Sequence, residues 1–335
     1  MIKKQIFYSK SFKDIIDIKK DFLNSNKKLL KQAEVWNKFY SKQPKRVTCK
    51  TCETKLPKKI FRSHSADYTI CLKCGHLNGL NLDTKNFNKH LYKDSKGIKF
   101  SKFYINNFKN RVKNIYHPKL KFLQKIIGKN LDILELGSGA GYFLKACEEK
   151  KVNAIGYDVN LSMVEFGKKM LKKNKIFQFG IDEIYNQVLL CKKETIVILG
   201  VIEHLENPNL IFKNFRKSKA KYLFFSVPTM SLSTILEHSF KMFYPRVLGG
   251  IHNHLYSEKS LNFIIDRNKL KIIGEWWFGT DMMDLMRAII IYSNPYNKKD
   301  FMINLNKYFI QIIDELQTIL DKKKLCGDVH MVLSK

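Results

Sequence analysis

The sequence is poor in acidic residues and has no long apolar run. Its 335 residues include 61 lysines and arginines but only 30 aspartates and glutamates, which gives a formal net charge of +31. No apolar stretch approaches the roughly 20 residues that a membrane-spanning helix needs. The first ten residues also lack the apolar core of a secretory signal peptide. We therefore predict no membrane span and expect a cytoplasmic protein.

The excess of positive charge has two interpretations. A basic surface binds the phosphates of a polyanion such as RNA. However, lysine greatly outnumbers arginine in this chain, and arginine is the residue that nucleic-acid readers use for bidentate contacts. The lysines can equally reflect the codon bias of an A+T-rich genome. A mildly anionic substrate, such as a nucleotide sugar, is compatible with both interpretations.

Four of the seven cysteines form two C-x-x-C pairs, Cys49 with Cys52 and Cys71 with Cys74. The spacing between the pairs is typical of a four-cysteine zinc site. Each pair places two thiolates on one side of a tight turn, and two such turns complete a tetrahedron around Zn²⁺. Disulfides are disfavoured in a chain without export signals. The pattern predicts a structural zinc ion with no position left open for water.

A short apolar strand followed by three alternating glycines is the most informative stretch of the chain. Residues 131–142 read LDILELGSGAGY. The glycines let a ligand lie against the backbone because no Cβ is in the way. A dinucleotide fingerprint has its third glycine one place later, where this chain has Tyr142. Glu135 is unfavourable beside a pyrophosphate, whereas it suits a ligand with a cationic amine and a sulfonium.

Asp158 ends the next predicted strand, about twenty residues after the glycine turn. In a βαβ unit this spacing brings an acidic side chain to the ribose hydroxyls of a nucleotide. The alternative is that Asp158 caps a helix over residues 161–172. Together these residues resemble motif I of the class I S-adenosylmethionine-dependent methyltransferases. The resemblance implies that S-adenosylmethionine is held by Glu135, Gly137, Ser138, Gly139, Gly141 and Asp158.

Two later segments carry histidines that could act as a general base, the usual role of histidine at neutral pH. Residues 200–208, GVIEHLENP, resemble a signature of ubiquinone-biosynthesis and sugar-modifying methyltransferases. Some relatives bind a divalent metal with an additional glutamate, at the place where Gly200 stands here. Residues 249–257, GGIHNHLYS, precede a helix that Ser257 is expected to cap. The candidate bases are His204, His252 and His254, with structural roles in their loops as the alternative.

Alternating strand and helix patterns indicate an α/β fold, with a doubly wound Rossmann-like methyltransferase sheet, a small N-terminal zinc-binding module and helical additions. A final apolar stretch, 329–333, resembles the antiparallel hairpin that closes the class I sheet. Apolar residues at helical spacing predict a long amphipathic helix from Phe301 to Leu320. The predicted segments are a helical N-terminus (1–46), a zinc-ribbon-like module (47–82), a helical cap or linker (83–130), and a methyltransferase domain (131–335) with insertions at about 229–247 and 280–324.

The resemblance implies an S-adenosylmethionine-dependent methyltransferase, and the added zinc module is similar to that of bacterial enzymes of surface-glycan pathways. We expect O-methylation of a small molecule such as a sugar, nucleotide sugar or surface-glycan precursor. The alternative is a methyltransferase of ribosomal or transfer RNA that holds nucleic acid with its zinc module and basic surface. Against that alternative, the chain has neither an Asn/Asp-Pro-Pro-Tyr/Phe motif nor a Pro-Cys catalytic motif.

Overall fold

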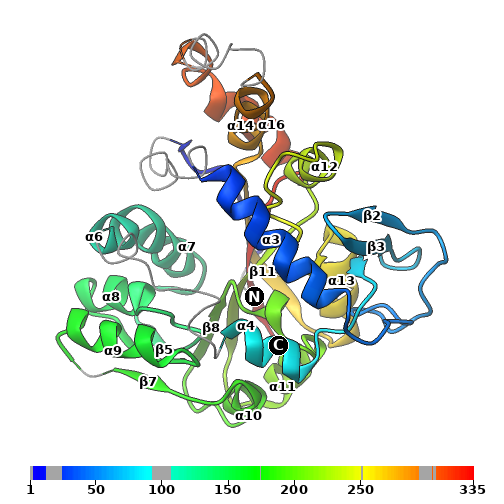
Figure 1. Ribbon diagram of the computed structural model, residues 1–335. Helices are drawn as coiled ribbons and strands as arrows, with labels where there is room; N and C mark the ends of the chain where they lie inside the picture. Colours follow the sequence, from blue (N-terminus) through cyan, green and yellow to red (C-terminus); the bar gives the residue numbers. More distant parts are fainter. Residues whose placement is uncertain are drawn as a thin grey trace.

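The computed structural model describes residues 3–12, 25–92, 107–173, 175–249, 252–293, 304 and 307–335. Within this part of the chain, an eight-stranded sheet has the order β1-β11-β12-β9-β8-β5-β6-β7. A separate four-stranded sheet has the order β10-β4-β3-β2. Figure 1 shows the small sheet lying to one side of the large one. No helix of the described part is long and apolar enough to cross a membrane.

Five parallel strands form the centre and one edge of the large sheet. They are β5 (Asp132–Leu136), β6 (Asn153–Asp158), β7 (Ile176–Gln178), β8 (Thr195–Leu199) and β9 (Tyr222–Pro228). Most of their apolar side chains are buried because helices cover both faces of a parallel sheet, whereas Phe177 on the edge strand β7 is exposed. The sequence pattern predicts all five, at residues 132–136, 154–157, 176–179, 195–199 and 222–227, to within one residue of each observed end.

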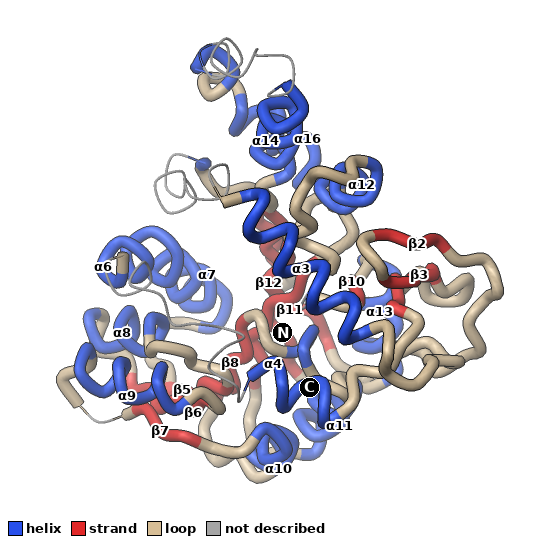
Figure 2. Tube along the Cα trace, viewed as in Figure 1, coloured by secondary structure: helices blue, strands red, loops and turns tan. Residues whose placement is uncertain are grey.

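Helices cover the two faces of the large sheet and bury one apolar cluster on each face (Figure 2). On one face lie α6 (Phe108–Arg111), a π-helical turn (Val112–Tyr116), α7 (His117–Ile127), α8 (Tyr142–Glu149) and α9 (Leu161–Met170). On the other lie α10 (Ile184–Leu189), α11 (Asn209–Lys217) and α13 (Glu258–Arg267). A further helix, α12 (Leu232–Ser239), follows β9.

The sheet is completed by an antiparallel pair and by the N-terminal strand. β12 (Asp328–Ser334) lies between β9 and β11 (Lys271–Phe278) and is antiparallel to both, as the resemblance implied. Beyond β11, β1 (Gln5–Tyr8) adds a parallel edge strand. The N-terminal segment predicted as helical (1–46) therefore contains a strand near its start, which the prediction did not include. The pairing partner of β1 is about 270 residues away in sequence, so no local pattern indicates it.

The connection between β11 and β12 holds α14 (Asp281–Ser293) and α16 (Ile313–Lys322), which extend away from the sheet in Figure 1. The predicted helix from Phe301 to Leu320 is interrupted, because residues 310–312 form a turn. Its first part, including Phe301 and Leu305, falls outside the described residues. The apolar residues predicted to face inward are also not the buried ones, since Leu316 and Leu320 are only half-buried whereas α16 buries Ile313, Gln317 and Asp321. The two polar side chains are buried because Gln317 bonds to both Asp281 and Asp321.

The smaller sheet contains β2 (Phe61–Ser63), β3 (Ala66–Ile70) and β4 (Leu77–Gly79) from the cysteine-containing region. Its fourth strand, β10 (His254–Leu255), comes from the loop before α13. α3 (Asn26–Tyr40) packs against this sheet through Tyr40, and α4 (Lys85–Tyr92) follows it. Of the predicted linker 83–130, residues 93–106 lie outside the described part.

Candidate active site

The glycine turn after β5 folds as a strand-to-helix connection with three left-handed residues. Gly137, Gly139 and Gly141 have φ values of 80°, 54° and 77°. Only glycine adopts this region without strain. At Gly137 there is also no room for a side chain, because a Cβ would lie 2.2 Å from the Cγ2 of Val201. The turn therefore needs glycine for its backbone conformation and for its contact with the loop after β8.

Asp158, at the end of β6, is held against this turn. Its two carboxylate oxygens accept hydrogen bonds from the backbone amides of Gly139 (2.7 Å) and Asn160 (2.9 Å). The cap of α9 is the side chain of Asn160, which accepts from the amide of Met163. Asp158 is thus not the helix cap that was considered as an alternative. Burial raises the pKa of its carboxyl group.

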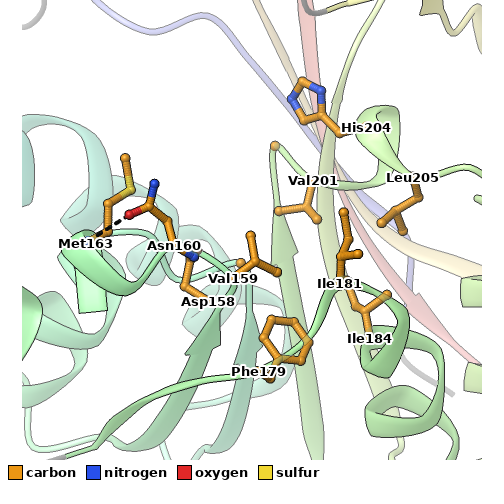
Figure 3. A pocket seen from close by; sticks show the side chains of 12 residues that line it. Asp158, Val159, Asn160, Met163, Phe179, Ile181, Ile184, Val201, His204 and Leu205 are labelled. Carbon is orange, nitrogen blue, oxygen red and sulfur yellow. Dashed lines mark hydrogen bonds between the residues drawn. The ribbon is translucent and has the colours of Figure 1, made fainter. Parts of the chain in front are cut away.

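A pocket of about 230 Å³ opens between this turn, the end of β6 and the loop after β8. Figure 3 shows Asp158 and Asn160 on one side and His204 at the upper end. The remaining walls are mostly apolar, with Val159, Phe179 and Ile181 among them. Such a pocket, with a carboxylate beside apolar walls, suits a nucleoside whose base is buried and whose ribose is hydrogen-bonded.

Glu135 and Ser138, which were also predicted to hold the cofactor, do not line this pocket. Glu135 is buried, and its Oε2 has no hydrogen-bond partner among the described residues. Burial, followed by the charge of Asp158, raises the pKa of Glu135 well above its usual range. Ser138 is buried with its Oγ beside Gly156. An unpaired carboxylate oxygen at this position is suited to a cationic group that approaches from the turn.

A second pocket, of about 250 Å³, adjoins the first at Gly200 and is lined by Glu203. We refer to it as the acceptor pocket. Burial raises the pKa of Glu203 to about 8. His252 also lines this pocket, and its ring stacks on that of His204, with centroids 4.9 Å apart. One ligand atom from each of Glu203, His204 and His252 lies within 4.8 Å of the others.

The tautomer of His252 is fixed by its surroundings. Its Nδ1 lies 3.2 Å from the carbonyl oxygen of Val247, so Nδ1 carries the proton and donates it. Nε2 is then the basic nitrogen. Burial lowers the pKa of the ring to about 4, which keeps it neutral at physiological pH. The arrangement can accept a proton at Nε2, and the cluster as a whole could also hold a cation through two imidazoles and a carboxylate.

Residues 108–274 match the family model described as a methyltransferase domain. The matched residues include the glycine turn, Asp158 and the histidine cluster. The chain carries a class I S-adenosylmethionine-dependent methyltransferase domain. None of the curated proteins matches the chain.

Several solved methyltransferase structures are similar in fold to this methyltransferase. An S-adenosylmethionine-dependent methyltransferase from Archaeoglobus fulgidus is 21% identical, with a TM-score of 0.44 over 69% of this chain and 100% of that one. Magnesium protoporphyrin IX methyltransferase from Synechocystis PCC 6803 is 13% identical, with a TM-score of 0.42 over 68% and 88%. A putative enzyme from Listeria monocytogenes is 10% identical, with a TM-score of 0.42 over 65% and 97%.

His254 does not line either pocket of the methyltransferase. It lies on β10, where it is buried and its Nδ1 is 3.0 Å from the Nε2 of His76. Burial lowers the pKa of both rings well below the usual range. Nearby, Asn253 donates to Asp83. The structure thus separates the three predicted histidines: His204 and His252 face the pockets, whereas His254 joins the catalytic domain to the cysteine module.

The four predicted metal-binding cysteines come together in the cysteine module, with their Sγ atoms within 4.8 Å of one another. Each C-x-x-C pair forms a turn in which the residue after the second cysteine has a left-handed backbone: Glu53 (φ 62°) and Gly75 (φ 70°). The amides of these residues donate to the carbonyls of Cys49 and Cys71. The turns direct all four thiols into one buried cluster.

Five charged residues of the acceptor pocket were not singled out from the sequence as site residues. Glu203 was noted only as part of a motif, although its position between a buried strand and His204 was a usable signal. The other four lie far apart in the chain and carry no recognisable motif; they are Lys10, Lys119, Arg246 and Asp328. Only the tertiary structure brings them together.

Proposed function

We propose that this methyltransferase transfers a methyl group to a hydroxyl of a small molecule, such as a sugar or a nucleotide-linked sugar. The observation that carries the proposal is the junction of two pockets. A nucleoside-type pocket meets the acceptor pocket at Gly200, and charged side chains and a histidine with a defined basic nitrogen, His252, line the acceptor pocket. When bound, S-adenosylmethionine supplies an electrophilic methyl group on a positively charged sulfur.

The residues of the first pocket fit that cofactor. Asp158 offers carboxylate oxygens where a ribose would lie, and Val159 and Phe179 offer apolar contacts to an adenine ring. The Oε2 atom of Glu135 has no hydrogen-bond partner among the described residues, and it is suited to bind the cationic amino group of the cofactor beyond the turn. We assign the turn glycines and Ser138 a role in shaping this site, because glycine has no side chain and the side chain of Ser138 is buried.

His252 is our candidate for the general base. Its Nε2 accepts the proton of the acceptor hydroxyl as the oxygen becomes a nucleophile. The bond from Nδ1 to the Val247 carbonyl orients the ring and stabilises the charge that it gains. His204, stacked on His252 and 3.9 Å from Glu203, orients the ring rather than taking the proton.

We further propose that the cysteine module holds a structural zinc ion. The Sγ separations of Cys49–Cys74 (3.6 Å) and Cys52–Cys71 (3.4 Å) are close to the about 3.8 Å expected between thiolates on one tetrahedral Zn²⁺. Four cysteine ligands leave no coordination position for water, so the ion would be structural.

The experiment that tests the function uses methyl-labelled S-adenosylmethionine and a fractionated cell extract. Incubation with the full-length protein should place the label in a low-molecular-weight product that is stable to nuclease. Replacement of His252 by glutamine should abolish this labelling. Label found only in RNA would refute the small-molecule proposal and favour the nucleic-acid alternative.

A further inference from the structure

We propose that the acceptor pocket recognises a negatively charged group, a carboxylate or a phosphate, of the molecule that is methylated, and holds it between Lys10, Lys119 and Arg246. The inference rests on the proposed function and specifies its substrate class. These three cationic side chains line one pocket of about 250 Å³. They come from the N-terminal segment, from α7 and from the loop after α12, respectively.

Cationic side chains outnumber acidic ones in the pocket lining. Two acidic side chains, Glu203 and Asp328, line it beside the three cations. One of the cations, Arg246, is already paired with Asp284, which does not line the pocket. Positive side chains from three separate segments therefore converge on one partly buried cavity, where an anion is stabilised more strongly than in water.

Lys119 is the clearest of the three cations. Its ammonium lies 5.1 Å from the centre of the Tyr116 ring and makes no ion pair with any of the described residues. Burial lowers the pKa of Lys119, while the more distant carboxyl groups of Asp328, Glu135 and Glu203 act in the opposite direction. A half-buried ammonium without an acidic partner within ion-pair distance carries a desolvation cost, which an anionic ligand would offset.

Arg246 is held firmly, yet it has an unused donor. Its terminal nitrogen donates to Asp284 (2.6 Å) and Thr280 (3.0 Å). Its backbone amide donates to the carboxylate of Glu237, which also receives the amides of the next two residues. The Nε of Arg246 is buried and has no hydrogen-bond partner in the described structure. A ligand oxygen in the pocket would satisfy it.

Hydrogen bonds of the residues immediately before and after Lys10 hold its backbone beside the pocket. Before it, the carbonyl of Ser9 accepts from the indole of Trp276, and the hydroxyl of Ser9 bonds to Thr318. After it, Ser11 and Phe12 donate to the carboxylate of Asp314. The edge strand β1 and helix α16 thus fix a backbone segment whose only residue lining the acceptor pocket is Lys10.

The charge of the acceptor can be tested before its identity is known. Small-molecule products labelled by the full-length protein are passed over an anion exchanger at neutral pH. We expect the label to be retained. Label that appears only in unretained, neutral products would overturn this inference while leaving the proposed function intact. Absence of label from every small molecule would instead refute the proposed function.

Variants then locate the anion site. Lys10→Met and Lys119→Met should each raise the KM for the retained acceptor roughly 10- to 100-fold, the usual cost of one charged hydrogen bond, with cofactor affinity unchanged. Lys10→Arg should retain most activity, which shows that the segment still folds. Lys3→Met, an exposed lysine of the same segment, is the matched control and should have no effect.

Inorganic phosphate serves as a probe of the same site. It should compete with the acceptor in the wild type more strongly than chloride at equal ionic strength, and this competition should weaken in Lys10→Met. If Lys119→Met lowers the affinity for S-adenosylmethionine and leaves the acceptor KM unchanged, the ammonium serves the carboxylate of the cofactor. That result, or a normal acceptor KM in both lysine variants, would overturn the inference.

Discussion

The first pocket, which we assign to the cofactor and call the cofactor pocket, is lined by residues between Gly137 and Leu205. The acceptor pocket is instead lined by residues from segments spread over most of the chain. The first is a succession of strands, turns and helices that contact their neighbours in sequence. The second combines Lys10, Lys119, the ends of β9 and β11, and the loop around His252. The cofactor half of the site is therefore formed by residues close together in sequence, whereas the acceptor half depends on the packing of segments that are far apart in sequence.

The loop that carries His252 shows how far this dependence extends. β10, two residues further on, pairs with β4 of the cysteine module. The amide of Gly79 donates to the Asn253 carbonyl, and Ser257 donates to the Cys74 carbonyl. The module is thus a support for the acceptor half of the site. The cofactor half has no lining residue from it.

Loss of the proposed zinc site should produce the largest difference between the cofactor half and the acceptor half. Structural zinc contributes about 10 kcal/mol or more to the folding of small zinc domains. Cys71→Ser should release the metal, unfold the module and abolish methyl transfer, while S-adenosylmethionine still binds. Metal analysis and calorimetry measure the two effects. Cys191→Ala, a buried cysteine outside the cluster, should keep its zinc. Equal loss of cofactor binding in Cys71→Ser would show that the halves are not separable.

Replacement of His252 should affect the reaction rate and not cofactor binding. His252→Gln removes the basic nitrogen and should lower kcat about 100- to 10,000-fold, the usual contribution of a general base. His117→Gln, at a surface ion pair with Glu149, is the control and should leave kcat unchanged. A kcat that survives in His252→Gln would remove this residue from the reaction.

The pH profile of the wild type distinguishes His252 from Glu203. A base must be deprotonated, so kcat falls as the pH drops through its pKa. With the pKa of His252 lowered to about 4, the rate should stay constant from neutral pH down to about pH 5. With the pKa of Glu203 raised to about 8, a profile that falls below pH 8 would identify Glu203 as the base.

Removal of the Asp158 carboxylate should act on the cofactor half alone. Asp158→Ala takes away the ribose-binding oxygens and the bond to the Gly139 amide, which together contribute about 2–3 kcal/mol. We expect an affinity for S-adenosylmethionine about 100-fold lower by calorimetry. Asp182→Ala, an exposed acid nearby, should bind normally. Unchanged affinity in Asp158→Ala would place the cofactor elsewhere.

The smallest expected effect concerns Asp314, which holds the backbone next to Lys10 through hydrogen bonds. Asp314→Ala removes two hydrogen bonds to the N-terminal segment, to Ser11 and Phe12, a change of about 1 kcal/mol. The acceptor KM should rise about fivefold, with cofactor affinity unchanged. Glu315→Ala, on the exposed side of α16, is the control. A change in cofactor affinity instead would mean that this segment supports the other half.

The strands and the glycine turn around the cofactor half could largely be predicted from the sequence. The strands around the glycine turn were correct to within a residue, because alternation of buried strands and amphipathic helices is a local pattern. The cysteine pairs were found for the same reason, since a C-x-x-C turn is complete within four residues. What the sequence could not show was that the strand after His252 belongs to the sheet of the cysteine module.

The errors of prediction occurred where burial depends on distant partners. The N-terminal segment reads as helical, yet Gln5–Tyr8 forms an edge strand because β11 offers it an unpaired backbone. The apolar spacing from Phe301 to Leu320 indicates one long helix, yet α16 turns polar Gln317 inward to meet Asp281. Buried polar residues are invisible to hydrophobic periodicity when their hydrogen-bond partners come from another element.

The sequence by itself determined the class of fold, the glycine turn of the cofactor site and the two C-x-x-C turns, because each depends on contacts within a short stretch of chain. Only the tertiary structure decided which histidine lines the acceptor pocket, which one joins the modules, and that Lys10 meets Lys119 and Arg246. These relations join residues up to about 240 positions apart. No local pattern encodes such contacts, because they exist only after the sheet, its insertions and the cysteine module have packed together.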